Sequence, residues 1–153
     1  MKFGIVLSAV VALTLVGSGA GFAATHGALA PLDEYFGKQK MSPLGIENTI
    51  HDTSLRVRYD PAHAARYYQG LESAEDALHD WARKYPKDPW LPGRAYYMSH
   101  VFWSMHTAPA DAAAHRCRLL LFTQFQRSRW SALAEHETQS AVAPVRVAKN
   151  RSS

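Results

Sequence analysis

The chain contains a single cysteine, Cys117, and lacks the short motifs that mark common catalytic and metal centres. One cysteine excludes an internal disulfide. The Cys-x-x-Cys-His motif of haem attachment and the His-Glu-x-x-His motif of zinc peptidases are absent, and the Gly-x-Ser-x-Gly motif of serine hydrolases is missing after residue 23. The sequence therefore offers no motif that assigns an enzymatic reaction. An enzyme whose catalytic groups meet only in the folded chain is our third hypothesis, after two kinds of binding protein.

Long apolar runs are also scarce, and the one that is present lies at the N-terminus. Lys2 precedes an apolar segment over residues 3–16, and the small residues that follow match a small-x-small cleavage site ending at Ala23. The apolar segment is shorter than the roughly 20 residues that span a bilayer. It predicts a signal peptide over residues 1–23 and a periplasmic or secreted protein with no transmembrane segment after cleavage. A membrane anchor is the alternative interpretation.

Charge is unevenly distributed along the rest of the chain. Residues 24–115 carry 9 Lys and Arg against 11 Asp and Glu, whereas residues 116–153 carry 7 against 2. The basic region is either a solvated helix face with a frayed tail or a surface that contacts an anionic partner such as lipid headgroups. Nucleic acid is not expected, because export removes the chain from it and the aromatic residues are not interleaved with basic ones. We predict one α-helical domain over residues 24–137 and a basic disordered tail over residues 138–153.

The proline-rich stretch YPKDPWLP, residues 85–92, is interpreted as a turn between two helices. The residue before a proline is disfavoured in a helix, whereas proline is tolerated in the first turn after a capping side chain. Tyr85 is therefore expected to end one helix, and Asp88 to cap the next. Ser42 and Asp60 also precede prolines and are expected to cap helices.

Apolar residues recur with helical periodicity between these breaks. Residues 74–85 carry an amphipathic stripe that includes Trp81, and residues 73–76 match a capping box. Gly37 and Gly70 suit helix C-termini. The predicted fold class is all-α, with five to six antiparallel helices in a helical-hairpin stack or an irregular bundle. Helices are expected near residues 31–36, 43–58, 61–69, 74–84, 89–106 and 109–136. On the last of these, Cys117 is either a small core residue or a reactive or intermolecular thiol.

The helix predicted over residues 89–106 is apolar on two sides. One face, which we expect to pack inward, consists of Tyr97, Met98, Val101, Phe102 and Met105. The other side carries Tyr96, His100 and Trp103, which are either covered by a neighbouring helix or bind a partner through their large apolar area. Together with Trp90 at the hairpin turn, these three residues form the predicted partner-binding site.

Residues 73–113 resemble a tetratricopeptide-type hairpin followed by the start of the next helix. The segment reads SAEDALHDWARKYPKDPWLPGRAYYMSHVFWSMHTAPADAA and covers about a third of the chain that remains after cleavage. The Trp, Leu-Gly and Tyr spacing of the repeat is absent, and no second copy follows at the repeat period. The whole chain is also similar to small exported helical proteins of bacteria with no assigned function. These resemblances imply a helical-hairpin fold and an exported protein, and they identify no catalytic residue.

Three acidic residues precede a histidine by one helical turn. The pairs are Glu47/His51, Glu75/His79 and Asp111/His115. Such a pair lies on one helix face and can chelate Zn²⁺ or another divalent ion, although the same spacing is also ordinary helix stabilisation.

We therefore expect an exported, non-catalytic helical protein that binds an envelope or extracellular protein or peptide through a groove between hairpins. No cofactor is predicted. The alternative is a helical bundle that binds a small ligand or a metal through its histidines. An exposed Tyr96/Trp103 side would favour the first hypothesis, and histidines that converge in a concave site would favour the second.

Overall fold

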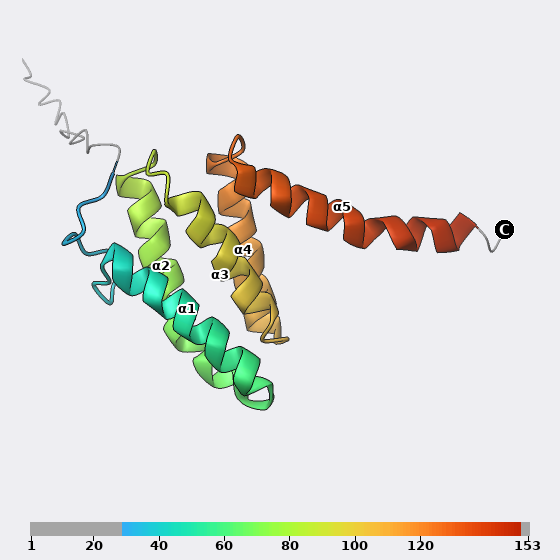
Figure 1. Cartoon of the computed structure of the whole chain (residues 1–153), viewed down its shortest axis with the longest axis horizontal. Coiled ribbons are helices and arrows are strands. Elements are labelled where there is room, and N and C mark those ends of the chain that lie inside the picture. Colours follow the sequence, from blue (N-terminus) through green and yellow to red (C-terminus); the bar gives the residue numbers. More distant parts are fainter. Residues whose placement is uncertain (1–28, 151–153) are drawn as a thin grey trace, which may run out of the picture.

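The computed structural model describes residues 29–150 and shows an all-α protein, as the sequence predicts. The prediction of a signal peptide over residues 1–23 lies outside the described residues. The elements in chain order are α1 (Pro43–Tyr59), the 3₁₀ helix η1 (Pro61–Tyr67), α2 (Tyr68–Lys84), α3 (Leu91–Trp103), α4 (Ala108–Gln124) and α5 (Arg129–Asn150) (Figure 1).

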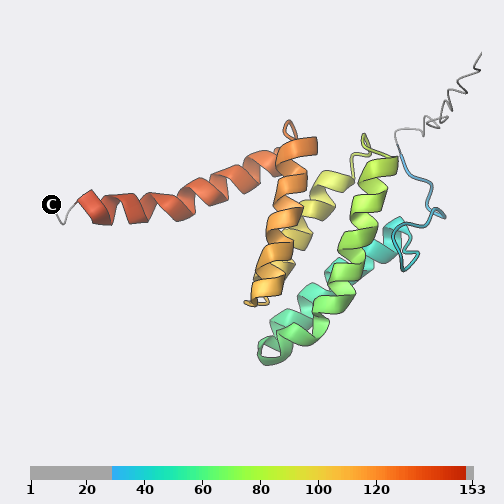
Figure 2. The same cartoon turned by 180° about the vertical axis from the view of Figure 1, so that it is seen from behind.

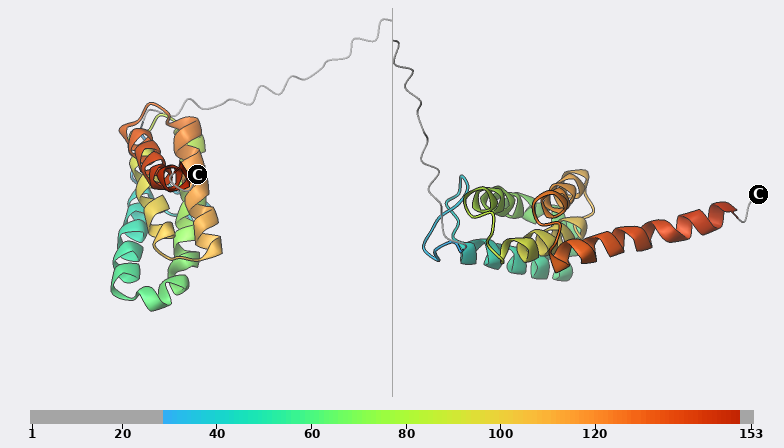
Figure 3. Two further views of the ribbon diagram at one scale, coloured as in Figure 1. Left: turned by 90° about the vertical axis from the view of Figure 1, so that its right-hand side faces the viewer. Right: turned by 90° about the horizontal axis from the view of Figure 1, so that it is seen from above.

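The helices form two hairpins, α1 with α2 and α3 with α4, which pack side by side. Seen from above, α1, α3 and α5 lie along one side of the molecule and α2 and α4 along the other (Figure 3). The second side faces the viewer in Figure 2. Helix α3 contacts each of the other four α-helices, whereas α5 contacts only α3 and α4 among the described elements. The α3 helix is therefore the centre of the structure.

Local capping chemistry begins the first helix at the predicted residue. Ser42 has extended backbone angles, and its Oγ accepts a hydrogen bond from the Gly45 backbone N–H at 3.1 Å. Helix α2 ends at Lys84, one residue before the Tyr85-Pro86 pair. Helix α3 begins at Leu91, and the Oδ1 atom of Asp88 accepts from the Trp90 backbone N–H at 3.0 Å. The proline-rich stretch is thus a turn between helices.

Three local predictions are wrong. No helix forms over residues 31–36; the chain instead makes a tight turn closed by an antiparallel bridge between Phe36 and Met41. The proposed capping box over residues 73–76 lies inside α2, where the Ser73 hydroxyl donates to the Gln69 carbonyl one turn earlier. Gly70 also lies inside α2 rather than at a helix end.

The predicted helix over residues 109–136 is two helices. Helix α4 ends at Gln124, and the chain turns at residues 125–128 before α5 begins. The Ser128 Oγ atom accepts from the Ser131 backbone N–H at 3.1 Å, and the buried Ser131 hydroxyl donates to the Phe125 carbonyl at 2.7 Å. These bonds satisfy the helix ends that the break exposes. Helix α5 then continues to Asn150, through the residues for which we predicted a disordered tail.

The N-terminal strap, residues 29–42, packs along α2. Phe36 is fully buried, and its ring stacks on Trp81 with centroids 5.7 Å apart. The Gly37 N–H donates to Asp80 Oδ2 at 2.9 Å, and the Ala30 N–H donates to Asp88 Oδ2 at 2.9 Å. Carboxylates on α2 and in the following turn therefore hold the backbone of the strap.

Gly37 is required by the close approach of the strap to α2. Its φ is +67°, and a Cβ atom at this position would lie 2.7 Å from the Ala77 Cα atom. We expect Gly37→Ala to lower the free energy of unfolding by more than about 1 kcal/mol. Gly70→Ala is the matched control, because a Cβ there meets nothing within 4 Å. It should raise the free energy of unfolding by about 0.5–1 kcal/mol by favouring the helix. Denaturant titrations followed by circular dichroism measure both changes, and equal stability of the two variants would contradict the prediction.

Candidate binding groove

An open groove of about 630 Å³ runs between α1 and α3. Its apolar floor is formed by Ile50 and Val57 of α1 and Val101 of α3. These three side chains are buried, whereas Tyr97 beside them is 48% exposed. We predicted that Tyr97 packs inward, and this prediction is wrong. Val101 is buried in the groove floor, whereas the Tyr97 ring, which contacts Trp130, lies in the groove wall.

The rim of this groove, called the α1–α3 groove below, carries charged and imidazole groups. Arg94 Nη2 lies 2.5 Å from Glu47 Oε2, while the Nε atom of Arg94 is buried and has no hydrogen-bond partner among the described residues. His51 Nδ1 lies 3.3 Å from Asp52 Oδ1. Arg58, also on the rim, is exposed and forms no ion pair within the described part of the chain. The groove therefore combines an apolar floor with groups that can donate hydrogen bonds to an acidic ligand.

The Glu47–Arg94 pair also lines a second, smaller cavity of about 270 Å³, which therefore adjoins the groove. Four large apolar side chains gather around this second cavity with most of their surface exposed. They are Leu29 at 56%, Leu32 at 82%, Leu44 at 58% and Trp90 at 57%. We call these four residues the apolar patch. Exposed large apolar residues are ordinary singly, but a contiguous group of them marks a contact surface.

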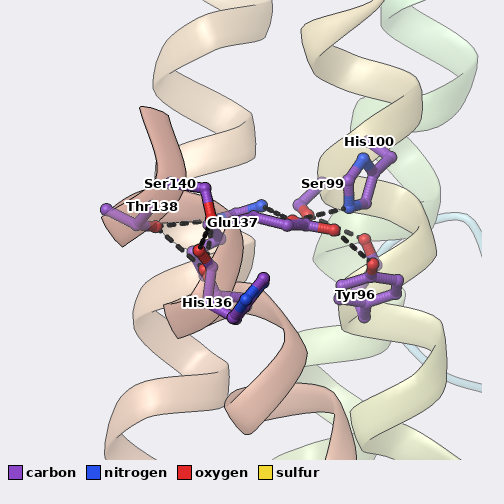
Figure 4. Close-up of polar contacts among 9 residues, drawn as sticks. Tyr96, Ser99, His100, His136, Glu137, Thr138 and Ser140 are labelled. Atoms are coloured by element: carbon purple, nitrogen blue, oxygen red, sulfur yellow. Dashed lines mark hydrogen bonds and ion pairs between the residues drawn. The ribbon is translucent and has the colours of Figure 1, made fainter. Parts of the chain in front are cut away.

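The other side of α3 is covered by the start of α5. Glu137 of α5 receives hydrogen bonds from the Tyr96 hydroxyl at 2.5 Å and from Arg118 Nη2 at 2.5 Å, and His100 Nε2 lies 3.2 Å from the same carboxylate (Figure 4). Burial, together with the hydrogen bond to the Glu137 carboxylate, raises the pKa of Tyr96 to about 12. Burial would raise the pKa of Glu137, but its hydrogen bond with Tyr96 and the charges of His100 and Arg118 lower it overall. This network fastens α5 to α3 and α4.

Of the four residues of the predicted partner-binding site, Tyr96, His100 and Trp103 lie together on α3, with neighbouring rings in contact, and Trp90 lies apart from them. Intramolecular contacts partly bury Tyr96 and Trp103. The ring centroids of Tyr96 and Trp130 are 5.1 Å apart, and the Arg118 Cζ atom lies 4.0 Å from the centroid of the Trp103 ring. His100 lines the α1–α3 groove, and Trp90 belongs to the apolar patch.

The acid–histidine pairs predicted as metal ligands lie on three different helices, and the carboxylates of two of them, Glu47 and Glu75, form ion pairs with arginines. Arg116 donates two hydrogen bonds to Glu75, at 2.8 and 2.6 Å, and His79 lies 3.7 Å from the same carboxylate. Burial would raise the pKa of Glu75, but hydrogen bonds from His79 and Arg116 lower it. Glu47 pairs with Arg94, as described above. Within residues 29–150, no group of three or more His, Cys, Asp or Glu side chains is placed to hold a metal ion, and Asp111 and His115 do not join such a group.

Cys117 is fully buried, and burial raises the pKa of its thiol. A buried, protonated thiol is a poor nucleophile, so the structure favours the core interpretation of this residue.

The chain matches no protein-family model, no curated protein and no solved structure. None of the helices in the described part of the chain combines the length and apolar character needed to cross a bilayer.

The sequence contains only weak signals for the groove. Arg58 and Arg94 look like ordinary solvent-facing residues, and their place on one rim depends on how α1 packs against α3. Leu44 and Trp90 are 46 positions apart, and they meet only because the strap and the two hairpins converge at one end of the molecule.

Proposed function

We propose that this protein is an exported, non-catalytic helical protein that binds a peptide, or a peptide segment of a protein partner, in the α1–α3 groove. The observation that carries the proposal is that the groove and the cavity beside the apolar patch adjoin at the Glu47–Arg94 pair. Together they follow α1 from Leu44 to Arg58, a length of about 21 Å at the helical rise of 1.5 Å per residue.

The shape of this surface favours an elongated ligand. A compact small molecule is usually enclosed by one cavity, whereas here two cavities open along one helix and share only the Glu47–Arg94 pair. A peptide helix laid in such a groove presents apolar residues at every third or fourth position. Its apolar side would contact Ile50, Val57 and Val101, and one end would reach the apolar patch.

The charges on the rim favour a peptide that carries Asp or Glu. Arg58 has no ion-pair partner among the described residues, and His51 lies about two turns from it on the same helix. An acidic side chain beside Arg58 would complement this part of the rim and increase specificity more than affinity. The apolar N-terminal segment with its small-residue end supports export, so the partner we propose is an envelope or extracellular protein.

Tyr97 provides the sharpest test, because it is half-exposed in the groove wall. Peptides are selected from a displayed library on the immobilised protein, and their dissociation constants are measured by fluorescence anisotropy. Tyr97→Ala should weaken the selected peptides about tenfold or more, as truncation of an interface aromatic does. Arg58→Glu should weaken acidic peptides more than neutral ones.

Tyr59→Ala is the matched control, because Tyr59 is 82% exposed at the end of α1 and does not line the groove. Its peptide affinities should equal those of the wild type. A library that yields no binder, or peptides that bind Tyr97→Ala as tightly as the wild type, would rule out the groove as a peptide site.

A further inference from the structure

A second apolar groove, of about 590 Å³, lies between α3 and α4. We call it the α3–α4 groove. Trp103, His115, Leu119 and Phe122 form its walls, and Glu137 and Thr138 of α5 line its edge. Leu119 is 61% exposed in it. Helix α5 thus covers the adjoining surface of α3 and α4 but leaves this groove open.

The part of α5 that follows Thr138 does not cover the groove. It projects away from the rest of the molecule in Figure 1 and in the right-hand view of Figure 3. We call residues 139–150 the arm; at the helical rise its length is about 18 Å.

The composition of the arm is unsuited to a helix that stands alone in water. Residues 141–148 read AVAPVRVA, with three β-branched valines, an interior proline and a single charged residue, Arg146. Proline inside a helix costs about 3 kcal/mol relative to alanine, and valine is also a weak helix former. Isolated helices of this length are marginal even with good helix formers. The helical arm therefore requires packing against another surface.

We infer that the arm of one molecule occupies the α3–α4 groove of a second copy, and that two copies exchange arms. Among residues 29–150, no element covers the groove and none supports the arm. The groove and the arm meet where α5 leaves the body, at Glu137 and Thr138. Because α5 is continuous from Arg129 to Asn150, its own groove lies beside the root of the arm and out of reach of its tip. A two-fold pair satisfies both needs at once, since each copy donates one arm and accepts one.

The inference is tested by disulfide trapping between differently tagged copies. One copy carries Leu119→Cys, and the other carries a single cysteine at successive positions of 141–148. Cys117 is buried and does not compete. After mixing and mild oxidation, we expect mixed disulfides at arm positions spaced three or four apart. Leu44→Cys in place of Leu119→Cys is the control, because Leu44 is similarly exposed, at 58%, but lies on α1. It should form no mixed disulfide above background.

Sedimentation equilibrium of the wild type should show a monomer–dimer equilibrium. Leu119→Asp should weaken the dimer at least tenfold, while Leu44→Asp should leave it unchanged; circular dichroism verifies that both variants are folded. A wild type that is monomeric at every concentration overturns the inference, as does a dimer that Leu119→Asp does not weaken. A disulfide formed within one chain carrying both cysteines, at dilutions where the protein is monomeric, would show that the arm folds onto its own groove and would equally overturn it.

Discussion

Replacing Trp81 with alanine is expected to lower the free energy of unfolding by about 3–5 kcal/mol. Trp81 is 3% exposed, its ring stacks on Phe36, and its Nε1 donates to Asp88 Oδ2 at 3.0 Å. The truncation leaves a cavity between the strap and α2 and removes one donor from a buried carboxylate. Thermal and denaturant unfolding followed by circular dichroism measures the loss.

Two further substitutions separate packing from hydrogen bonding. Trp81→Phe retains an aromatic ring but has no Nε1–H group, so it should cost less than Trp81→Ala. Trp90→Ala removes the same side chain from a position that is 57% exposed, and its effect on stability should stay within about 0.5 kcal/mol. If Trp81→Ala unfolded at the same denaturant concentration as Trp90→Ala, Trp81 would not be a core residue.

Features of the fold that depend on a few neighbouring residues could be predicted from the sequence. The Ser42 cap begins α1, and the Tyr85-Pro86 pair follows the end of α2, because each effect involves only the backbone next to it. The stripe that contains Trp81 is buried as its period requires. These signals were sufficient to establish an all-α fold.

Features that depend on distant contacts could not be predicted in this way. The break between α4 and α5 is stabilised by the Ser131 hydroxyl, which reaches back to carbonyls at the end of α4, whereas the local sequence there continues to look helical. The strap has no helix because Phe36 packs on Trp81 and the Gly37 amide binds Asp80, residues that lie more than 40 positions along the chain.

In the candidate site, too, the sequence predicts what depends on neighbouring residues and not what depends on distant contacts. Helical periodicity predicts Tyr96 and Tyr97 on opposite sides of α3, but their rings contact each other and both contact Trp130 of α5. Periodicity also does not show which side of α3 another helix covers. The side carrying Tyr96 is covered because the Tyr96 hydroxyl donates a hydrogen bond to Glu137 of α5, a residue 41 positions further along the chain. Tyr97 remains half-exposed beside α1. The side of α3 that we expected to be internal therefore contributes to the groove.

Asp88→Ala is expected to lower the free energy of unfolding by about 3 kcal/mol or more and to release the strap. Asp88 is 2% exposed and accepts three hydrogen bonds, from Trp81 Nε1 at 3.0 Å, from the Ala30 N–H at 2.9 Å and from the Trp90 N–H at 3.0 Å. Each buried donor left without its acceptor costs about 1–3 kcal/mol. Asp88→Asn keeps one oxygen acceptor and should be destabilised less than Asp88→Ala.

The release of the strap connects this carboxylate to the proposed function. Ala30 lies between Leu29 and Leu32, so the hydrogen bond to Asp88 holds both leucines beside Leu44 and Trp90 in the apolar patch. In Asp88→Ala, the Ala30 amide should exchange its hydrogen faster than in the wild type, and library-selected peptides that contact the patch should bind more weakly. The α1–α3 groove remains intact in this variant, so Tyr97→Ala should weaken these peptides further. Unchanged exchange at Ala30, or a melting temperature equal to that of the wild type, would show that Asp88 does not hold the strap.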